Sequence, residues 1–449
     1  MAGNFFRYGN EELPVYDSVD VLVVGGGPAG IGAAFAAGRQ GMKTLIVEQF
    51  NCLGGVATAG GHGYYCKFSA WASEQRIVDG IGYEVARRIE KEGYGTCDVN
   101  GTYFEVEGLK FILEKMVREE GLGVLYYTFF CETIVENGLV KGGIIRNKSG
   151  RQAVLARRVI DCTGDGDVAA SADARCEVGR PEDGKCQPMT LMFTVGGVDW
   201  AEVKKWRKDY QMTEVWLEAQ KNGDMEPFQN QIMGFWWTPT RPDQVGINFT
   251  HITGGVSTSA EDLTYATIEG RRQAFHSIDV FRKYVPGMEN CYMVSTPNTV
   301  GIRESRRIIG DVVLSEEDML SGREWEDSIG YGSFFIDIHN IDGPGMSETT
   351  YRPDPGFRYQ IPYRILLPLE LENILTAGRC ASVTHVGLGS IRVMAQCFVM
   401  GQAAGTAAAI SLEDGTSPRD IDWGKLQCRL RESGCILDES DIAGIPEGS

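Results

Sequence analysis

The chain has 449 residues and a formal net charge of −18 at pH 7. This length exceeds what one hydrophobic core usually supports, so we expect two interleaved domains. The acidic charge argues against a nucleic acid or a membrane surface as partner, because phosphate binding is driven by clustered Lys and Arg. Residues 1–7 lack the basic region and apolar core of a signal peptide, which predicts a cytoplasmic protein.

Neither the cysteines nor the uncharged stretches indicate a metal site or a membrane span. The twelve cysteines form no C-x-x-C pair and no Cys/His cluster at zinc spacing. Residues 21–38 lack charge but are broken by a Gly-Pro turn. Residues 393–412 also lack charge, but Gln396, Gln402 and several Gly and Ala residues favour a helix buried in a protein core.

The first motif is a strand, a glycine turn, a helix and a second strand over residues 19–48. Gly25 permits the tight turn, Gly27 lets the backbone approach a pyrophosphate, and Gly30 lets the helix lie close to the strand. Glu48 ends the second strand, where a carboxylate can accept the hydroxyl groups of an adenosine ribose. Together these features predict a dinucleotide-binding βαβ unit.

The next segments continue this domain. Residues 52–63 are too rich in glycine for regular structure and suit contact with a flat ligand. Apolar spacing then predicts helices around residues 81–89 and 109–117. Residues 123–160 are predicted as strands with turns at Asn137-Gly138 and Ser149-Gly150, a small antiparallel insertion that returns to the main sheet. A polar glycine turn, Asp161 to Asp167, follows the last of these strands.

The middle of the chain differs from the first 185 residues in its sequence pattern. Residues 186–285 mix strands such as 191–195 with Trp-rich helices, and a long helix is predicted over 261–284. Phe235, Trp236, Trp237 and His251 are interpreted either as pocket residues or as core.

The last part begins with the basic motif of residues 301–307, preceded by a predicted buried strand over 296–302. It ends with a strand at 373–377, a loop, and a helix predicted to begin near Ser390. Such an arrangement presents backbone N–H groups and the positive end of a helix dipole to an anion.

Three segments together resemble the FAD-dependent oxidoreductases of the glutathione-reductase-like superfamily, and more narrowly the bacterial family known as FAD-dependent oxidoreductase. They are residues 25–30 with Glu48, residues 159–167, and residues 374–379 leading into 389–394. The resemblance implies an α/β fold, with a Rossmann-type FAD-binding domain and an interleaved α+β substrate domain. The expected division is FAD-binding for 15–185, 286–320 and 365–430, substrate or cap for 186–285 and 321–364, and a C-terminal tail for 431–449.

The resemblance also implies where FAD lies. Its pyrophosphate would contact the Gly25 turn, and its ribose would contact Glu48. Its ring would lie near Gly54-Gly55 and the segment 385–393, with the closing helix directed at the ring edge where negative charge develops on reduction. The residues expected to contact FAD are Gly25, Gly27, Pro28, Ala29, Gly30, Glu48, Gln49, Gly54, Gly55, Thr58, Thr163, Gly164, Asp165, Gly378, Arg379, Gly389, Ser390, Arg392 and Val393.

No second G-x-G-x-x-G follows a strand, so a dedicated nicotinamide domain is not expected. The predicted function is hydride transfer between the flavin and a small organic substrate, as a dehydrogenase or a C=C reductase. Two alternatives stay open: an electron-transfer subunit that serves a protein partner, and a non-catalytic FAD-binding module. An external electron carrier and a homo-oligomer also stay open.

A flavin dehydrogenase needs a base for the departing proton, and the chain has five histidines. His385 is the first choice because the resemblance places it beside the flavin, and His62 and His339 are further candidates. Arg303 is predicted to bind a carboxylate substrate or the FAD phosphates, with an inter-domain ion pair as the alternative. Tyr363 would position a substrate or pack in the core, while Cys380 and Cys397 are interpreted as buried thiols.

Overall fold

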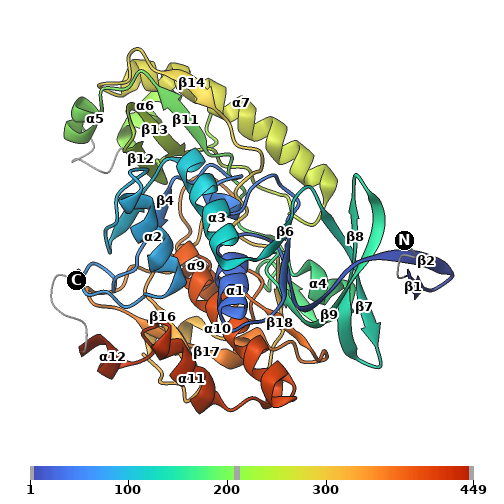
Figure 1. Cartoon of the computed structure of the whole chain (residues 1–449). Coiled ribbons are helices and arrows are strands. Elements are labelled where there is room, and N and C mark those ends of the chain that lie inside the picture. Colours follow the sequence, from blue (N-terminus) through green and yellow to red (C-terminus); the bar gives the residue numbers. More distant parts are fainter. Residues whose placement is uncertain (1–4, 207–212, 444–449) are drawn as a thin grey trace.

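The computed structural model describes residues 5–206 and 213–443. Its largest sheet follows the order β6-β3-β2-β9-β8-β7, with β1 paired to β2 and β18 paired to β9 (Figure 1). β6, β3, β2, β9 and β18 are parallel to one another, whereas β8 and β7 are antiparallel additions. The strands of this sheet are β1 (Phe5–Tyr8), β2 (Glu11–Val24), β3 (Thr44–Val47), β6 (Gly123–Leu125), β7 (Phe129–Glu136), β8 (Leu139–Asn147), β9 (Gly150–Asp161) and β18 (Ile374–Thr376).

The predicted antiparallel insertion is confirmed as β7, β8 and the first half of β9. β9 is long enough to pair with β8 through residues 150–155 and with β18 through residues 159–161. Asn137 and Gly138 join β7 to β8 with φ of +52° and +77°. Two consecutive positive φ values are typical of the tight hairpin turn that Asn-Gly favours. The insertion therefore extends the sheet and returns the chain to its centre.

Helix α1 (Pro28–Arg39) packs against α10 (Met394–Asp414) at very short range. A Cβ added at Gly401 would lie 2.0 Å from the carbonyl oxygen of Ala29, and one at Gly405 would lie 2.1 Å from that of Ala33. Only small residues allow this approach. The order of these contacts means that both helices run in the same direction, so both N-termini point the same way.

α10 is buried along almost its whole length, which confirms the prediction of a core helix for residues 393–412. Among the described residues, no single helix is long and apolar enough to span a membrane, and α9 (His385–Ile391) with α10 passes only as a pair bent by 93°.

A second sheet, in the order β12-β13-β11-β14, lies at the top of Figure 1 with the long helix α7 against it. It has a hydrophobic core of its own that includes Phe193, Trp216 and Phe281. α7 confirms the predicted long helix. The elements of this region, called the cap below, are β11 (Phe193–Gly196), β12 (Gly234–Thr238), β13 (Arg241–Asn248), β14 (Tyr292–Ser295), α5 (Trp200–Trp206), α6 (Thr213–Lys221) and α7 (Ala260–Tyr284).

Two of the expected domain boundaries are corrected by strand pairing and packing. β14 pairs with β11 in the cap sheet, so the chain returns to the main body after residue 295 and not at 286. Residues 328–332 and 359–362 form a strand pair whose side chains share one hydrophobic core with α1 and α10. That pair thus packs with the main body, although the sequence suggested the cap.

The remaining elements lie outside the main sheet and the cap sheet. They are β4 (Tyr64–Cys66), β5 (Gly101–Tyr103), β10 (Cys176–Val178), β15 (Arg306–Ile308), β16 (Ser328–Gly332), β17 (Tyr359–Pro362), α2 (Ile81–Lys91), α3 (Val106–Glu120), α4 (Asp167–Ser171), α8 (Glu316–Leu320), α11 (Trp423–Glu432), α12 (Glu439–Ala443) and the short 3₁₀ turns Gly55–Ala57, Tyr363–Leu366 and Pro418–Asp420.

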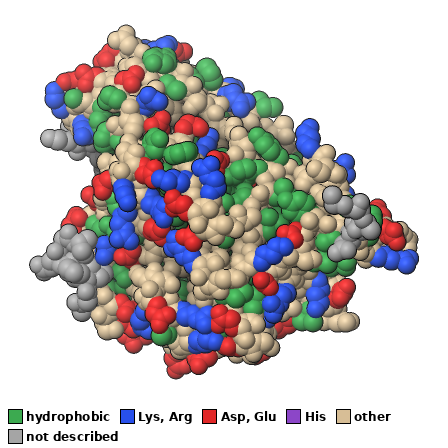
Figure 2. Space-filling view, viewed as in Figure 1, with side chains coloured by type: hydrophobic (Ala, Val, Ile, Leu, Met, Phe, Trp, Pro, Cys, Tyr) green, Lys and Arg blue, Asp and Glu red, His purple; other side chains and the backbone are tan. Residues whose placement is uncertain are grey.

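On the face shown in Figure 2, Lys and Arg side chains are interspersed with Asp and Glu. The structure also has ion pairs near its surface, such as that of Arg39 with Glu84 at 2.8 Å. The excess negative charge is therefore not gathered into one block on this face.

Candidate functional site

A cavity of about 1370 Å³ extends along the carboxyl ends of the parallel strands. Its lining combines the turn between β2 and α1, the end of β3, the turn after β9, the start of α10 and several cap residues. In open parallel sheets the carboxyl ends of the strands are where ligands bind.

The glycine turn at residues 25–30 forms one wall. Gly25 has φ of +96°, and a Cβ there would lie 2.4 Å from the carbonyl oxygen of Cys162. A Cβ at Gly30 would lie 1.8 Å from the carbonyl oxygen of Gly25, so the helix can begin here only without a side chain. At Gly27 the nearest atom would be 3.9 Å away, which leaves the backbone open on the cavity side.

The N-terminus of α1 belongs to the same wall and faces the cavity. Gly27 is the N-cap, no side chain caps the first turn, and Pro28 occupies the first position. Uncapped N–H groups and the helix dipole attract an anion, and a pyrophosphate fits here without a Cβ in its path. The glycine turn therefore fits the diphosphate of FAD.

Glu48 follows β3 and lines the same part of the cavity. Its Oε2 accepts a hydrogen bond from the N–H of Gly26 at 2.7 Å, and its Oε1 accepts one from Phe50 at 2.8 Å. Burial raises the pKa of Glu48, although these backbone donors counteract it. The carboxylate is thus fixed in one orientation, with its remaining lone pairs available to ribose hydroxyl groups.

The loop after β3 contacts the glycine turn through a backbone hydrogen bond. The N–H of Gly54 donates to the carbonyl oxygen of Gly26 at 2.8 Å, and Gly55 lines the cavity. Thr58 does not line it, because its hydroxyl donates to the carbonyl oxygen of Leu53 at 2.6 Å. Gly54 and Thr58 hold this loop in place.

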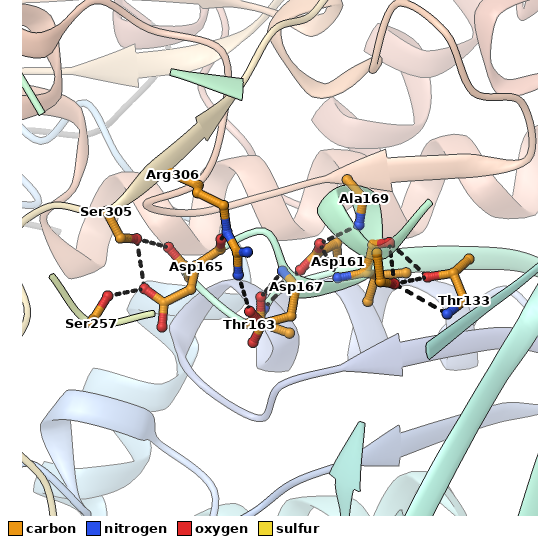
Figure 3. A network of polar contacts seen from close by, with 12 residues as sticks. Thr133, Asp161, Thr163, Asp165, Asp167, Ala169, Ser257, Ser305 and Arg306 are labelled. Carbon is orange, nitrogen blue, oxygen red and sulfur yellow. Dashed lines mark hydrogen bonds and ion pairs between the residues drawn. The ribbon is translucent and has the colours of Figure 1, made fainter. Parts of the chain in front are cut away.

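Asp161 organises the turn that follows β9 (Figure 3). Its Oδ1 accepts hydrogen bonds from the N–H and hydroxyl of Thr163, at 3.1 and 2.7 Å. Its Oδ2 accepts from the N–H groups of Val168 and Ala169, at 2.9 and 3.0 Å, which caps α4. This one buried side chain fixes both ends of the turn, so Thr163 and Gly164 reach the cavity wall.

Asp165 joins three parts of the chain at the cavity wall (Figure 3). Its Oδ1 accepts from Ser257 of the cap at 2.7 Å and from Ser305 at 2.6 Å, and it lies 2.8 Å from the guanidinium of Arg379. Burial favours the neutral acid, but Arg379 and the hydroxyl donors lower the pKa of Asp165. Arg306 completes the network by donating to the carbonyl oxygen of Asp165 at 2.7 Å.

The closing segment is divided differently from the prediction. The helix predicted from Ser390 begins at Met394 with Val393 as its N-cap, and a separate short helix, α9, precedes it. Arg392, Val393 and Met394 line the cavity. Ser390 does not, because its hydroxyl bonds to the carbonyl oxygen of Phe334 and to the Tyr359 hydroxyl.

Gly389 also lies outside the cavity lining. A Cβ at this position would lie 3.0 Å from the backbone N of Asp337. Gly389 and Ser390 therefore position the segment 334–338, whereas Gly378, Arg379, Arg392 and Val393 stay at the cavity wall.

Four charged or titratable residues of the cavity lining, called the charged cluster below, are Arg303, Asp337, His339 and Arg392. Oδ2 of Asp337 lies 2.9 Å from Arg392, and its Oδ1 lies 3.4 Å from Nε2 of His339. Burial, reinforced by Arg303, lowers the pKa of His339 to about 3. The imidazole is therefore neutral at physiological pH, and its Nδ1 has no hydrogen-bond partner among the described residues.

His62 lies in the same cavity, with its ring centroid 4.7 Å from that of Trp236. Burial lowers its pKa to about 4, and its Nδ1 has no partner within the part of the chain that the structure describes. Phe235 and Trp236 line the cavity, whereas Trp237 and His251 do not. Two of the four residues that the sequence left open thus line this cavity, and His251 lines a separate, smaller pocket.

His385, the first choice from the sequence, does not line the cavity. Its Nδ1 lies 2.7 Å from Oε1 of Glu304, and the same oxygen lies 2.5 Å from Arg307. Arg303 and Glu304 are neighbours in the chain, yet Arg303 lines the cavity and Glu304 points into the core. The structure therefore places His385 in a buried ionic network, and we withdraw it as a contact to the flavin.

The structure also shows the surroundings of residues 296–302, Tyr363, Cys380 and Cys397. Residues 296–302 form no strand, apart from one bridge between Gly301 and Thr190. Tyr363 is fully buried, and its hydroxyl donates to the carbonyl oxygen of Pro418 at 2.7 Å. Cys380 is buried, while Cys397 is buried but contributes to the cavity wall, with a pKa raised by burial to about 12.

Sequence reasoning missed Asp337 and Asn248, both of which line the cavity. A signal for Asp337 exists: it stands two residues before His339 in an alternating apolar segment, and residues i and i+2 of an extended chain share one side. No comparable signal marks Asn248.

Comparisons with known proteins support the cofactor part of this site. The profile of the family described as FAD dependent oxidoreductase matches residues 20–430. A thiamine thiazole synthase of Aeropyrum pernix is 34% identical over 184 residues, which are 38% of this chain and 63% of that protein. A dihydrolipoyl dehydrogenase of Trypanosoma brucei brucei is 31% identical over 165 residues, 34% of this chain and 31% of that protein. The chain thus spans less than two thirds of either relative.

Among solved structures, a geranylgeranyl bacteriochlorophyll reductase-like protein of Thermoplasma acidophilum is 16% identical, with a TM-score of 0.47 and coverage of 93% of this chain and 83% of that one. The p-nitrophenol 4-monooxygenase of Pseudomonas putida is 11% identical, with a TM-score of 0.47 and coverage of 95% and 88%. The match over residues 20–430 and the fitting glycine turn lead to one conclusion: the chain belongs to the FAD dependent oxidoreductase family and is an enzyme with FAD as its cofactor.

Proposed function

We propose that this enzyme transfers hydride between FAD and a small organic substrate that binds against the charged cluster. The observation that carries the proposal is the imidazole of His339, which lines the cavity with Nδ1 unpartnered among the described residues and Nε2 facing Asp337. A carboxylate behind the ring favours a proton on Nε2 and leaves Nδ1 as an acceptor.

When bound, FAD supplies a two-electron centre that takes up hydride from a substrate carbon or returns it. In the oxidising direction, Nδ1 of His339 would accept the proton that leaves the substrate O–H or N–H. Asp337 would keep the ring oriented and stabilise the positive charge that then forms. In the reducing direction, the same imidazole would return the proton, by microscopic reversibility.

The start of α10 supports this proposal electrostatically. Val393 is its N-cap, no side chain caps the first turn, and both Val393 and Met394 line the cavity. The positive end of a helix dipole stabilises negative charge nearby, typically by about 0.3–1 kcal/mol and more when partly buried. Arg392 adds a full positive charge, although Asp337 partly neutralises it.

The test is anaerobic mixing of the FAD-loaded enzyme with hydroxy acids, amino acids, amines and sugars, while flavin absorbance is followed. Bleaching by at least one compound is expected. The photoreduced enzyme is tested in parallel against enoates, which would reoxidise it if the reducing direction operates.

One result would favour an electron-transfer subunit instead. If no small molecule bleaches or reoxidises the flavin, while photoreduction still reduces it, hydride exchange with a small substrate is refuted.

A further inference from the structure

Arg303 is a buried cation that faces the cavity without an anionic partner. Only 6% of its surface is exposed. Its Nη1 donates to the carbonyl oxygen of Pro188 at 2.7 Å, and its Nη2 donates to Oδ1 of Asn248 at 3.4 Å. Both acceptors are neutral, and within the described ranges no carboxylate lies close enough to form an ion pair with Arg303.

Other buried arginines near the site either form an ion pair with a carboxylate or donate hydrogen bonds to several neutral acceptors. Arg307 lies 2.5 Å from Glu304, and Arg392 lies 2.9 Å from Asp337. Among the residues that the structure describes, Arg158 has no carboxylate partner either, but it donates to Ser411, to Thr416 and to the carbonyl oxygen of Arg157, and it does not line the cavity. A buried charge without a counter-charge is costly, so such a group in a ligand cavity points to a ligand that completes it.

The effect of this charge is visible in its neighbours. Arg303 contributes, after burial, to the lowered pKa of His62, His251 and His339. Burial and repulsion by Arg392 lower the pKa of Arg303 itself to about 9, although Asp337 opposes this shift, so Arg303 is still a cation at neutral pH. An anion bound at Arg303 would offset the contribution of its charge to the histidine pKa values, while the larger contribution of burial would remain.

The surrounding lining indicates what kind of anion fits. Trp236, Phe335 and Tyr64 contribute large apolar surfaces, which a small inorganic ion would leave exposed. Lys67 and Arg352 add further positive charge to the same cavity. A guanidinium fork matches the two oxygens of a carboxylate, so an organic carboxylate satisfies both the charge and the apolar walls.

We propose that the substrate is an α-hydroxy or α-amino carboxylic acid, whose carboxylate pairs with Arg303 while its O–H or N–H faces His339. This inference rests on the proposed hydride transfer. In the oxidising direction bound FAD would supply the acceptor for the hydride of the α-carbon, and the hydroxyl or amino proton would pass to Nδ1 of His339. The C–O or C–N single bond becomes a double bond, and the product is a 2-oxo or 2-imino acid.

The same geometry couples binding to the proton transfer. Burial is the main cause of the low pKa of His339, and the charge of Arg303 lowers it further, so pairing of Arg303 with a carboxylate would remove the second contribution and raise that pKa. Asp337, Arg392 and His251 are the other charged or titratable groups close to the ring. His339 would thus become a stronger base when an acid substrate is in place.

The experiment compares benzoate with its neutral analogue benzamide, by titrating the flavin absorbance spectrum of the FAD-loaded enzyme. Wild type should bind benzoate measurably tighter than benzamide. In Arg303→Met, the Kd of benzoate should rise by about 10- to 100-fold while that of benzamide stays within about twofold. Arg303→Lys keeps the positive charge but not the two-pronged guanidinium, so its Kd for benzoate should lie between those of wild type and Arg303→Met.

Arg271→Met, an exposed arginine on α7, is the matched control and should leave both Kd values unchanged. Flavin content and melting temperature of each variant show that the fold and the cofactor site persist. If Arg303→Met and Arg303→Lys both bind benzoate like wild type, or if both lose FAD because Arg303 serves the cofactor, the inference is overturned.

Activity separates this inference from the proposed function. If α-hydroxy or α-amino acids bleach the flavin and their amides do not, both stand. If neutral compounds bleach it as fast as acids do, hydride transfer stands and the carboxylate assignment fails. If nothing bleaches or reoxidises the flavin although benzoate binding depends on Arg303, the carboxylate subsite stands and hydride transfer fails.

Discussion

The two parts of the cavity differ in how their polar groups are satisfied. In the nucleotide part, Glu48, Asp161 and Asp165 each accept hydrogen bonds from the chain. The donors to Asp161 lie in its own turn, whereas Ser257 and Ser305 reach Asp165 from distant segments. In the charged cluster and beside it, buried atoms such as Nδ1 of His339 and Nε of Arg392 have no partner within the described residues. The first part is preorganised by the chain, and we propose that a ligand completes the second.

This contrast has an energetic meaning. An unsatisfied buried polar group costs about 1–3 kcal/mol, which a folded protein tolerates mainly where function requires it. Mutations in the nucleotide part should therefore affect cofactor retention. Mutations in the charged cluster should affect substrate binding and turnover while FAD stays bound.

The largest effect is expected for His339→Gln. Loss of a general base typically reduces a rate by about 10²- to 10⁴-fold, and glutamine keeps much of the volume without a comparable base. Stopped-flow measurement of flavin reduction by a substrate found in the anaerobic screen would detect this. The flavin content should match wild type; a rate within a few-fold of wild type would remove His339 from the proposed mechanism.

Glu48→Ala should produce the largest effect in the nucleotide part. It removes the acceptor for the N–H groups of Gly26 and Phe50 and the expected ribose contact. We expect FAD to bind about 10- to 100-fold more weakly, measured by flavin fluorescence after dialysis. Glu136→Ala, an exposed substitution on β7, is the matched control. Unchanged flavin retention in Glu48→Ala would contradict the assignment of this carboxylate.

His385→Asn changes a buried residue that lies outside the cavity lining. It breaks the 2.7 Å contact with the buried carboxylate of Glu304, so we expect a loss of about 1–3 kcal/mol in the free energy of unfolding. Urea titration measures this loss. The rate of flavin reduction should stay close to that of wild type, whereas a selective fall in rate with normal stability would restore a catalytic role for His385.

The smallest expected effect is a pH dependence of stability. The pKa of His339 is lowered to about 3, so between pH 6.5 and pH 3 the unfolded chain takes up a proton at this residue and the folded chain does not. Stability therefore falls as the pH falls below 6.5, by at most about 2 kcal/mol at pH 5 for one such histidine.

Urea unfolding of wild type and His339→Gln at pH 7 and pH 5 measures this contribution. The loss on acidification should be smaller in the variant, because the variant lacks this proton uptake. An equal loss in both proteins would show that His339 is not held neutral.

Much of the nucleotide part was predictable because its interactions are local. The Gly25 turn, Glu48 and the turn after Asp161 each lie within one βαβ unit or one strand end, where glycine spacing has a direct steric meaning. The Asn137-Gly138 hairpin and the long helix of residues 260–284 follow from turn chemistry and apolar spacing in the same way.

The charged cluster was less predictable because its members are distant in sequence. Arg303 was proposed for a ligand, but Asp337 was missed, and His385 was preferred to His339. The orientation of His385 depends on the bend between α9 and α10 and on Glu304, which no local pattern encodes.

The sequence alone predicted the βαβ unit of a dinucleotide site, the core helix of residues 393–412 and the basic motif around Arg303, while FAD as the cofactor followed from the resemblance to a known family. Steric and periodic rules act over a few residues and can be seen in a single segment. Only the tertiary structure shows which histidines reach the cavity, that Arg303 lacks an anionic partner among the described residues, and that the strand pair of residues 328–332 and 359–362 packs with the main body. These properties depend on burial and on charges from separate segments, which only the packed chain brings together.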